Sequence, residues 1–291
     1  MKAKSILINY LFVLPAVLIF GIFYIYPFLK VFQLSLMEWD GILPTMQFVG
    51  ISNFKEIMTD KIWWDSMWHA GYITLIALTF QNGLALLLAL ACDREIKYGN
   101  IFRVIFFIPP ILSEVVVGLI WQWILDGNYG ILNNAFNAMG MHSLVRNWLS
   151  DPKTALTCIA VVHSWKGFGW GFIILLAGLQ TIPKQLYEAA KVDGADSWQV
   201  FTKITIPLMI PVFSMVIILT ILGSMQVFVL IISMVGQGLV HHTDVPVLRI
   251  LASMTGSSRF GYACAQGIIF GLVLIIISFT QKKLSERIKQ A

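Results

Sequence analysis

Six long apolar stretches limit what this chain can fold into. A helix needs about 20 residues to cross the hydrocarbon of a bilayer. Only 12% of the residues are charged, about half the share found in soluble domains, so lipid must cover much of the surface. No stretch alternates like a barrel strand, and helices satisfy their own backbone in lipid. The sequence therefore predicts an all-α polytopic membrane protein with six transmembrane helices, at Ile8–Lys30, His69–Ala91, Phe102–Leu125, Thr154–Leu179, Ile206–Val235 and Ala263–Phe279.

The segments between these stretches are short, which predicts one transmembrane domain over residues 1–291. No GxxxxGK[ST] phosphate loop occurs, so we expect no ATP site in this chain. The histidines and carboxylates show no spacing typical of a metal site or a nucleophile–base pair, so we expect neither a metal nor an enzyme active site. The net charge of +5 comes without a basic cluster interleaved with aromatics, which argues against nucleic-acid binding.

Lysine and arginine counts orient the predicted spans. With both termini in the cytoplasm, the inner segments carry 12 of these residues and the longer outer loops carry 6. The positive-inside rule favours that topology. The inner set is Lys2, Lys4, Arg94, Lys97, Arg103, Lys184, Lys191, Lys203, Lys282, Lys283, Arg287 and Lys289.

The cytoplasmic loop over residues 182–207 is predicted to form two short amphipathic helices. Pro183 suits a helix start, Gly194 permits the left-handed geometry of a helix stop, and Asp196 or Ser197 can cap a second helix. Pro207 then begins the fifth span. The apolar face of such a pair either lies on the membrane surface or docks into a groove on a cytoplasmic partner.

This loop resembles the EAA loop of bacterial binding-protein-dependent ABC importers. That pattern is Glu-Ala-Ala, a glycine four residues after the second alanine, nine residues, and Ile-x-Leu-Pro. Here the last part reads Ile204-Thr205-Ile206-Pro207, with isoleucine replacing leucine. The resemblance implies a type I ABC importer permease fold in which the loop inserts into an ATPase subunit. The residues implied to couple the two subunits are Glu188, Ala189, Ala190, Asp193 and Gly194.

The resemblance extends over nearly the whole chain and narrows the family to carbohydrate permeases of the maltose and glycerol-phosphate type. Trp39-Asp40-Gly41, Gly118-Leu119-Ile120-Trp121 and Tyr129-Gly130-Ile131-Leu132-Asn133 are among the motifs that carry it. It implies a sugar importer in a bacterial inner membrane. Its implied partners are a second permease subunit in a heterodimer, two ATPase subunits that bind the ATP and Mg²⁺, and an extracytoplasmic solute-binding protein. Import of another polar solute such as glycerol phosphate, and a secondary transporter without an ATPase, are the alternatives.

Polar residues inside spans are costly and often functional. Glu114 lies near the middle of the third predicted span, Lys166 near the middle of the fourth, and Gln81 and Asn82 in the second. Two interpretations are open. Lys166 pairs with Glu114, or Lys166 and His163 together bind an anionic group of the solute. Matching motifs place the sugar-binding positions of the family on this sequence. With the polar residues above, the resemblance implies a solute-binding set of Glu114, His163, Trp165, Lys166, Gly167, Trp170, Thr220, Ser224, Gln226 and Val227.

Overall fold

The computed structural model describes residues 12–93, 99–236 and 242–290. Contacts divide the chain into two compact units, and each is described by itself. The larger unit comprises Trp64–Val247 and the residues from Leu274 onward, and the smaller comprises the described residues up to Trp63 with Leu248–Val273. That the whole chain acts as one domain stays a prediction.

The described residues are almost entirely helical, which confirms the all-α prediction. Six apolar spans are present if one sharply bent pair of helices counts as a span. The start predicted for the first span, Ile8, and the inner charges Lys2, Lys4, Arg94 and Lys97 lie outside the described residues. The five unbroken spans are Phe12–Ser35, Lys61–Asp93, Ala155–Gln180, Ser197–Met225 and Phe260–Arg287.

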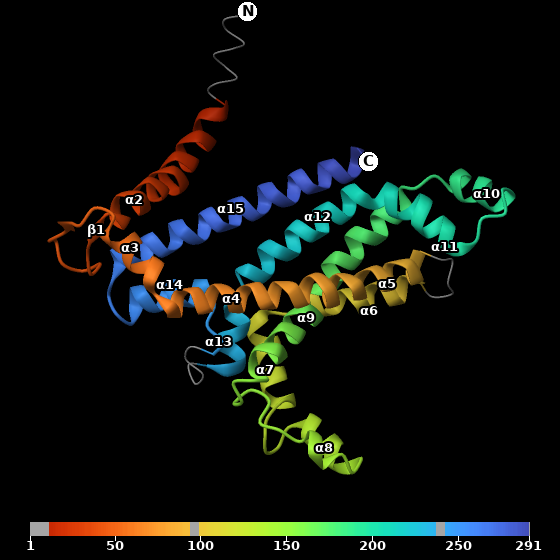
Figure 1. Cartoon of the computed structure of the whole chain (residues 1–291), viewed down its shortest axis with the longest axis horizontal. Helices are drawn as coiled ribbons and strands as arrows, with labels where there is room; N and C mark the ends of the chain where they lie inside the picture. The colour runs from red at the N-terminus through yellow and green to blue at the C-terminus, as the bar shows by residue number, and fades with distance from the viewer. Residues whose placement is uncertain (1–11, 94–98, 237–241, 291) are drawn as a thin grey trace, which may run out of the picture. The chain divides into compact units, whose positions relative to one another are not determined.

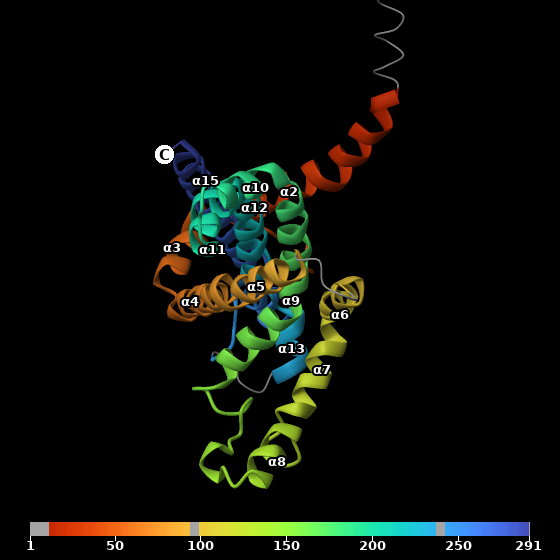
Figure 2. The ribbon, with the colours of Figure 1, turned by 90° about the vertical axis from the view of Figure 1, so that its right-hand side faces the viewer.

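The third span is not the single helix that its hydropathy predicts. Helix α6 (Gly99–Ile111) and helix α7 (Glu114–Ile124) meet at a bend of 93°, and Figure 2 shows the chain turning sharply between them. Pro109 and Pro110 lie in the last turn of α6 and lack the N–H groups that would close it. Glu114 is therefore in the first turn of α7, not in the middle of a straight span.

The fifth apolar run is also divided. Helix α12 (Ile206–Met225) ends before Gln226, and a separate short helix α13 (Val229–Val235) follows. At its other end, α12 continues from α11 (Ser197–Val200) through the π-helical segment η4 (Phe201–Thr205), so the predicted second loop helix and the fifth span form one continuous helix.

Two further π-helical segments occur among the described residues. Segment η1 (Gly21–Ile25) precedes α2 (Tyr26–Ser35) in the first span. Segment η2 (Ala77–Gln81) separates α4 (Lys61–Ile76) from α5 (Asn82–Asp93) in the second span.

In the larger unit, α9 (Ala155–Gln180) packs against α5 and α12 (Figures 1 and 2). Small residues bring these helices close together, because a side chain on Gly171 would touch Ala85 and one on Gly178 would press on Val212. Helix α7 packs against α13 with Gly118 facing Ser233. Short helices α8 (Ile131–Ala138) and η3 (His142–Leu144) follow α7. The buried core of the three long helices includes Ala85, Ala89, Phe172, Leu175, Leu179 and Met209.

In the smaller unit, strands β1 (Met37–Glu38) and β2 (Gln47–Phe48) form a two-stranded antiparallel hairpin after α2. Helix α3 (Ser52–Thr59) follows, and its buried Asn53 donates hydrogen bonds to the Ser35 and Met37 carbonyl oxygens. Among the described residues, the other two helices are α14 (Pro246–Thr255) and α15 (Phe260–Gln290), and parts of both belong to the larger unit.

Candidate functional site

A cavity of about 410 Å³ lies in the larger unit, in the size range of small-ligand sites. We call it the span cavity. Its lining residues repeat every three or four positions along α9 and α12, so each helix offers one face to it. The lining consists of Gln81, Glu114, His163, Lys166, Gly167, Trp170, Gly171, Ile174, Val216, Leu219, Thr220 and Gly223.

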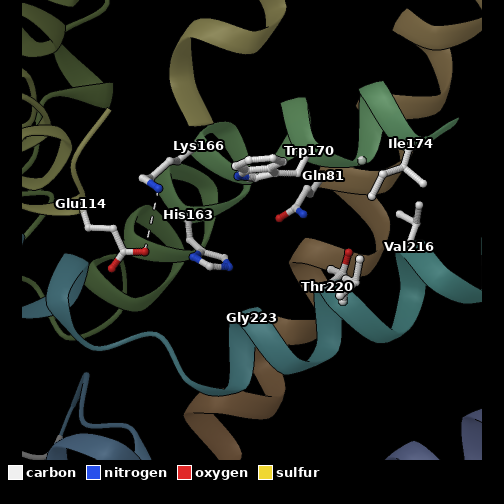
Figure 3. A pocket seen from close by; sticks show the side chains of 12 residues that line it. Gln81, Glu114, His163, Lys166, Trp170, Ile174, Val216, Thr220 and Gly223 are labelled. Carbon is white, nitrogen blue, oxygen red and sulfur yellow. Dashed lines mark ion pairs between the residues drawn. The ribbon is translucent and has the colours of Figure 1, made fainter. Parts of the chain in front are cut away.

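An ion pair spans one side of the cavity. Lys166 on α9 and Glu114 on α7 place Nζ and Oε1 3.9 Å apart (Figure 3), which is too long for a hydrogen bond. The Lys166 side chain is 16% exposed and that of Glu114 is 39% exposed. The lysine is therefore the more desolvated partner, and its ammonium group retains donors for another acceptor.

Amide and hydroxyl groups from two helices approach the opposite side. The Thr220 hydroxyl donates to Asn82 Oδ1 at 3.0 Å. The Asn82 amide nitrogen and the Gln81 amide oxygen are buried and have no hydrogen-bond partner within the protein. Figure 3 shows the Gln81 amide between Trp170 and Thr220. Apolar walls with a few polar groups suit a solute with both hydroxyls and an apolar face.

The structure brings six of the ten predicted solute-binding residues to this cavity. These are Glu114, His163, Lys166, Gly167, Trp170 and Thr220.

The other four predicted residues do not line the cavity. Trp165 packs edge-on against Trp121, with ring centroids 5.5 Å apart. Ser224 is fully buried and donates to Thr74 Oγ1 and to the Thr220 carbonyl oxygen. Gln226 is exposed, because α12 ends one residue before it. Val227 is buried.

Sequence reasoning singled out Gln81 as polar within a span but left it out of the predicted site. The lining residues Gly171, Ile174, Val216, Leu219 and Gly223 were missed entirely. Helical spacing from His163 and Lys166 along α9, and from Thr220 along α12, would have found these five.

The loop over residues 182–207, which we call the EAA hairpin, has the predicted structure of two helices around Gly194. Helix α10 (Lys184–Val192) ends in a Schellman motif, in which the Ala195 N–H donates to the Ala190 carbonyl and the Gly194 N–H to the Lys191 carbonyl. The φ of Gly194 is +75°, which a residue with a side chain rarely adopts.

Helix α11 begins with a capping box. The Asp196 carboxylate accepts from the Gln199 N–H, and the Gln199 side chain accepts from the Asp196 N–H. The Tyr187 and Thr205 hydroxyls lie 3.2 Å apart and join α10 to the base of the fifth span. The hairpin lies at the end of α12 (Figure 1), and this contact ties it there.

Two large apolar side chains stand out on the exposed surface of the hairpin. Val192 is 88% exposed and Trp198 is 70% exposed. Glu188, Ala189, Asp193 and Gly194 are also exposed, whereas Ala190 is buried. A tryptophan at the tip of a short hairpin is typical of a protein-binding surface.

A second, polar cavity of about 470 Å³ lies in the smaller unit. Three of the charged residues in its lining already have partners. Arg259 holds Glu56 through two hydrogen bonds, Nη1 to Oε1 at 2.7 Å and Nη2 to Oε2 at 2.5 Å, and this contact raises the pKa of Arg259. The N–H groups of Ile42 and Leu43 donate to Asp40 and lower its pKa. These bonds favour a structural role for the carboxylates.

Across residues 12–93, 99–236 and 242–290, no three His, Cys, Asp or Glu side chains are placed to share a metal ion. The polar part of the span cavity's lining consists of hydrogen-bonding side chains and one ion pair.

The chain matches known transport proteins over most of its length. Residues 81–290 match the family described as binding-protein-dependent transport system inner membrane component. The multiple sugar-binding transport system permease protein MsmF of Streptococcus mutans is 32% identical, over 91% of this chain and 91% of its own. A probable ABC transporter permease protein of Pyrococcus horikoshii is 31% identical, over 92% and 91%.

The fold is that of a type I ABC importer permease, as predicted. A crystal structure of a bacterial ABC transporter involved in the import of the acidic polysaccharide alginate superposes with a TM-score of 0.85, at 24% identity, over 98% of this chain and 97% of that one. The family match includes the EAA hairpin and every residue that lines the span cavity. The chain is therefore a multi-pass membrane protein that belongs to the inner membrane components of binding-protein-dependent transport systems.

Proposed function

We propose that this chain is one of two membrane-spanning subunits of an ATP-driven importer for a sugar or oligosaccharide. The observation that carries the proposal is the family match over residues 81–290, which contain both the EAA hairpin and the span cavity. The relative MsmF is a sugar permease by name. Trp170 offers a ring for the apolar face of a sugar, and Gln81 and Thr220 offer groups for its hydroxyls.

The family match supports the partners that we propose. ATP and Mg²⁺ bind to two separate ATPase subunits, in keeping with the lack of a phosphate loop in this sequence. We expect this chain to catalyse no reaction, because its family consists of transport components. A second, different permease subunit completes the pathway, and an extracytoplasmic binding protein delivers the solute. Both termini lie in the cytoplasm, as the distribution of lysine and arginine favours.

The EAA hairpin transmits movement from the ATPase. Trp198 and Val192 enter a groove on the ATPase, and Glu188 pairs with a basic group there. ATP closes the ATPase dimer, and the hairpin moves with it as a unit because Tyr187 and Thr205 join it to the fifth span. The spans then rock around the span cavity and expose it to each side of the membrane in turn.

An acidic sugar fits the cavity best. Lys166 is largely desolvated, and Glu114 approaches it only to 3.9 Å. A solute carboxylate can make a shorter, charge-assisted hydrogen bond to that ammonium group. Glycerol phosphate is the second candidate, because Lys166 and His163 would also suit a phosphate.

Affinity purification of the tagged chain from native membranes in mild detergent, followed by mass spectrometry, tests the assignment. We expect an ATPase, a second permease and a binding protein to copurify. The complex is then reconstituted in liposomes and offered an alginate trisaccharide, maltotriose, lactose and glycerol 3-phosphate. Recovery of the chain alone even after crosslinking, or ATP-independent uptake, would point instead to a secondary transporter.

A further inference from the structure

Gln81 is a buried amide on the wall of the span cavity. The residue is 7% exposed, and its Oε1 has no hydrogen-bond partner within the protein. An unmet acceptor inside a membrane span costs free energy that an apolar residue of similar size would avoid. Because Gln81 lines the cavity, a bound solute can supply the missing donor.

The backbone at Gln81 is unusual as well. Two of the three described π-helical segments, η1 and η4, end two residues before Pro27 and Pro207. A wider turn there relieves the clash between the proline ring and the carbonyl four residues earlier. Segment η2 ends at Gln81 and has no proline after it, so the proline explanation does not apply. π-Helical turns are frequent at functional sites.

The facing helix leaves room for this amide. A Cβ atom on Gly167 would lie 2.5 Å from Gln81 Oε1 and 2.7 Å from its Cδ, so only glycine permits the observed position. Trp170, one turn further along α9, borders the same part of the cavity (Figure 3). The amide thus lies in the space that the missing side chain of Gly167 leaves beside the cavity.

We propose that Gln81 binds the transported solute, with Oε1 accepting a hydrogen bond from a sugar hydroxyl. An amide oxygen can only accept, so the matching solute group must be a donor. The contact selects for a hydroxyl at one position on the sugar. This assignment rests on the proposed function, since it assumes that solute passes through the span cavity.

The test uses the complete reconstituted importer and whichever sugar of the panel the wild type transports fastest. Gln81→Leu and Gln81→Met remove the amide and keep an apolar side chain of similar size. Loss of one neutral hydrogen bond predicts a drop of about tenfold in the sugar transported per ATP hydrolysed, at saturating loaded binding protein. Thermal stability should stay equal or rise, because a buried unmet polar group is removed.

Gln266 provides a matched control. It lies on α15 outside the span cavity, is 0% exposed, and both of its amide atoms lack a partner. Gln266→Leu removes the same kind of group and should leave the sugar-to-ATP ratio within twofold of the wild type.

An unchanged ratio in both Gln81 variants overturns the inference while wild-type uptake still upholds the proposed function. Loss of the second permease from the purified Gln81 variants would assign the amide to a subunit interface and would also overturn it. If the wild type transports no sugar, the proposed function itself fails.

Discussion

In the EAA hairpin, residues close in sequence cap the ends of both helices with hydrogen bonds. In the span cavity, polar side chains come from different helices, and some of them have no partner. Gly194 and Asp196 complete the motifs that end α10 and begin α11. By contrast, Lys166 and Glu114 remain 3.9 Å apart, and Gln81 Oε1 has no partner. The backbone groups at the helix ends of the hairpin have hydrogen-bond partners, and the hairpin exposes apolar side chains. The cavity has apolar walls and exposes polar side chains that lack partners.

This difference supports a different proposed partner for each region. Trp198 and Val192 need a partner that covers apolar surface, which a folded protein groove supplies. The ammonium of Lys166 and the amide of Gln81 need a partner rich in acceptors and donors, which an acidic sugar supplies. Changes in the hairpin should affect coupling to the ATPase, whereas changes in the cavity should affect which solute is transported.

Reversing the charge of Glu188 should have the largest effect. If Glu188 pairs with a basic group on the ATPase, Glu188→Lys places two positive charges together and should reduce uptake by at least about 100-fold. The protein should still reach the membrane, because Glu188 is exposed. Uptake and ATP hydrolysis in reconstituted vesicles measure the effect.

Glu188→Gln is the control for that change, because it removes the charge without reversing it and should be milder. Normal uptake by Glu188→Lys would contradict the coupling role. It would leave Glu188 as a solvated charge on an exposed helix face.

Removing the charge of Lys166 should affect only acidic solutes. Lys166→Met should lower uptake of an alginate trisaccharide by roughly 10- to 100-fold, the loss expected for a charge-assisted hydrogen bond. Uptake of the carboxyl-reduced trisaccharide, which is neutral, should change by less than threefold. Both probes are delivered at saturating binding protein, so that the permease step is compared.

Equal losses for the two probes would argue that Lys166 serves only to pair with Glu114. Glu114→Gln then becomes informative. It removes the competing carboxylate, so if Lys166 receives the solute it should preserve or increase uptake of the acidic probe.

Predictability from the sequence follows the same division. The two hairpin helices, the stop at Gly194 and the cap at Asp196 were predictable because each depends on residues close in sequence. The six spans were predictable from hydropathy alone. Whether the EAA hairpin contacts an ATPase, and which residues touch solute, stay predictions.

What failed depended on backbone breaks and on packing between helices. Hydropathy does not detect the bend after Pro110, because both α6 and α7 are apolar. It also missed the break at Gln226, which leaves that side chain exposed outside the cavity. The close approach of Gly167 to Gln81 depends on how two helices pack, and no local pattern encodes that contact.

Filling the space at Gly167 should have an intermediate effect. Gly167→Ala places a methyl group where Gln81 Oε1 lies, so the amide must move. Overpacking and loss of the solute contact should together lower uptake by about tenfold. In a Gln81→Ala background the same change should have little further effect, because the group it displaces is already gone.

Two equal and additive losses from Gly167→Ala and Gln81→Ala would show that the residues act independently. Uptake of the two single variants and the double variant, measured in one preparation, gives the coupling directly.

Removing the cap of α11 should have the smallest effect. Asp196→Ala deletes the acceptor for the Gln199 N–H, a loss of about 1 kcal/mol of local helix stability. Asp196→Asn keeps a capping oxygen and should behave like the wild type. Because the cap orders the hairpin but touches no solute, Asp196→Ala should weaken retention of the ATPase in detergent and lower uptake two- to fivefold for acidic and neutral probes alike. A loss confined to one class of solute would link the hairpin to selectivity and would break the separation between the two regions.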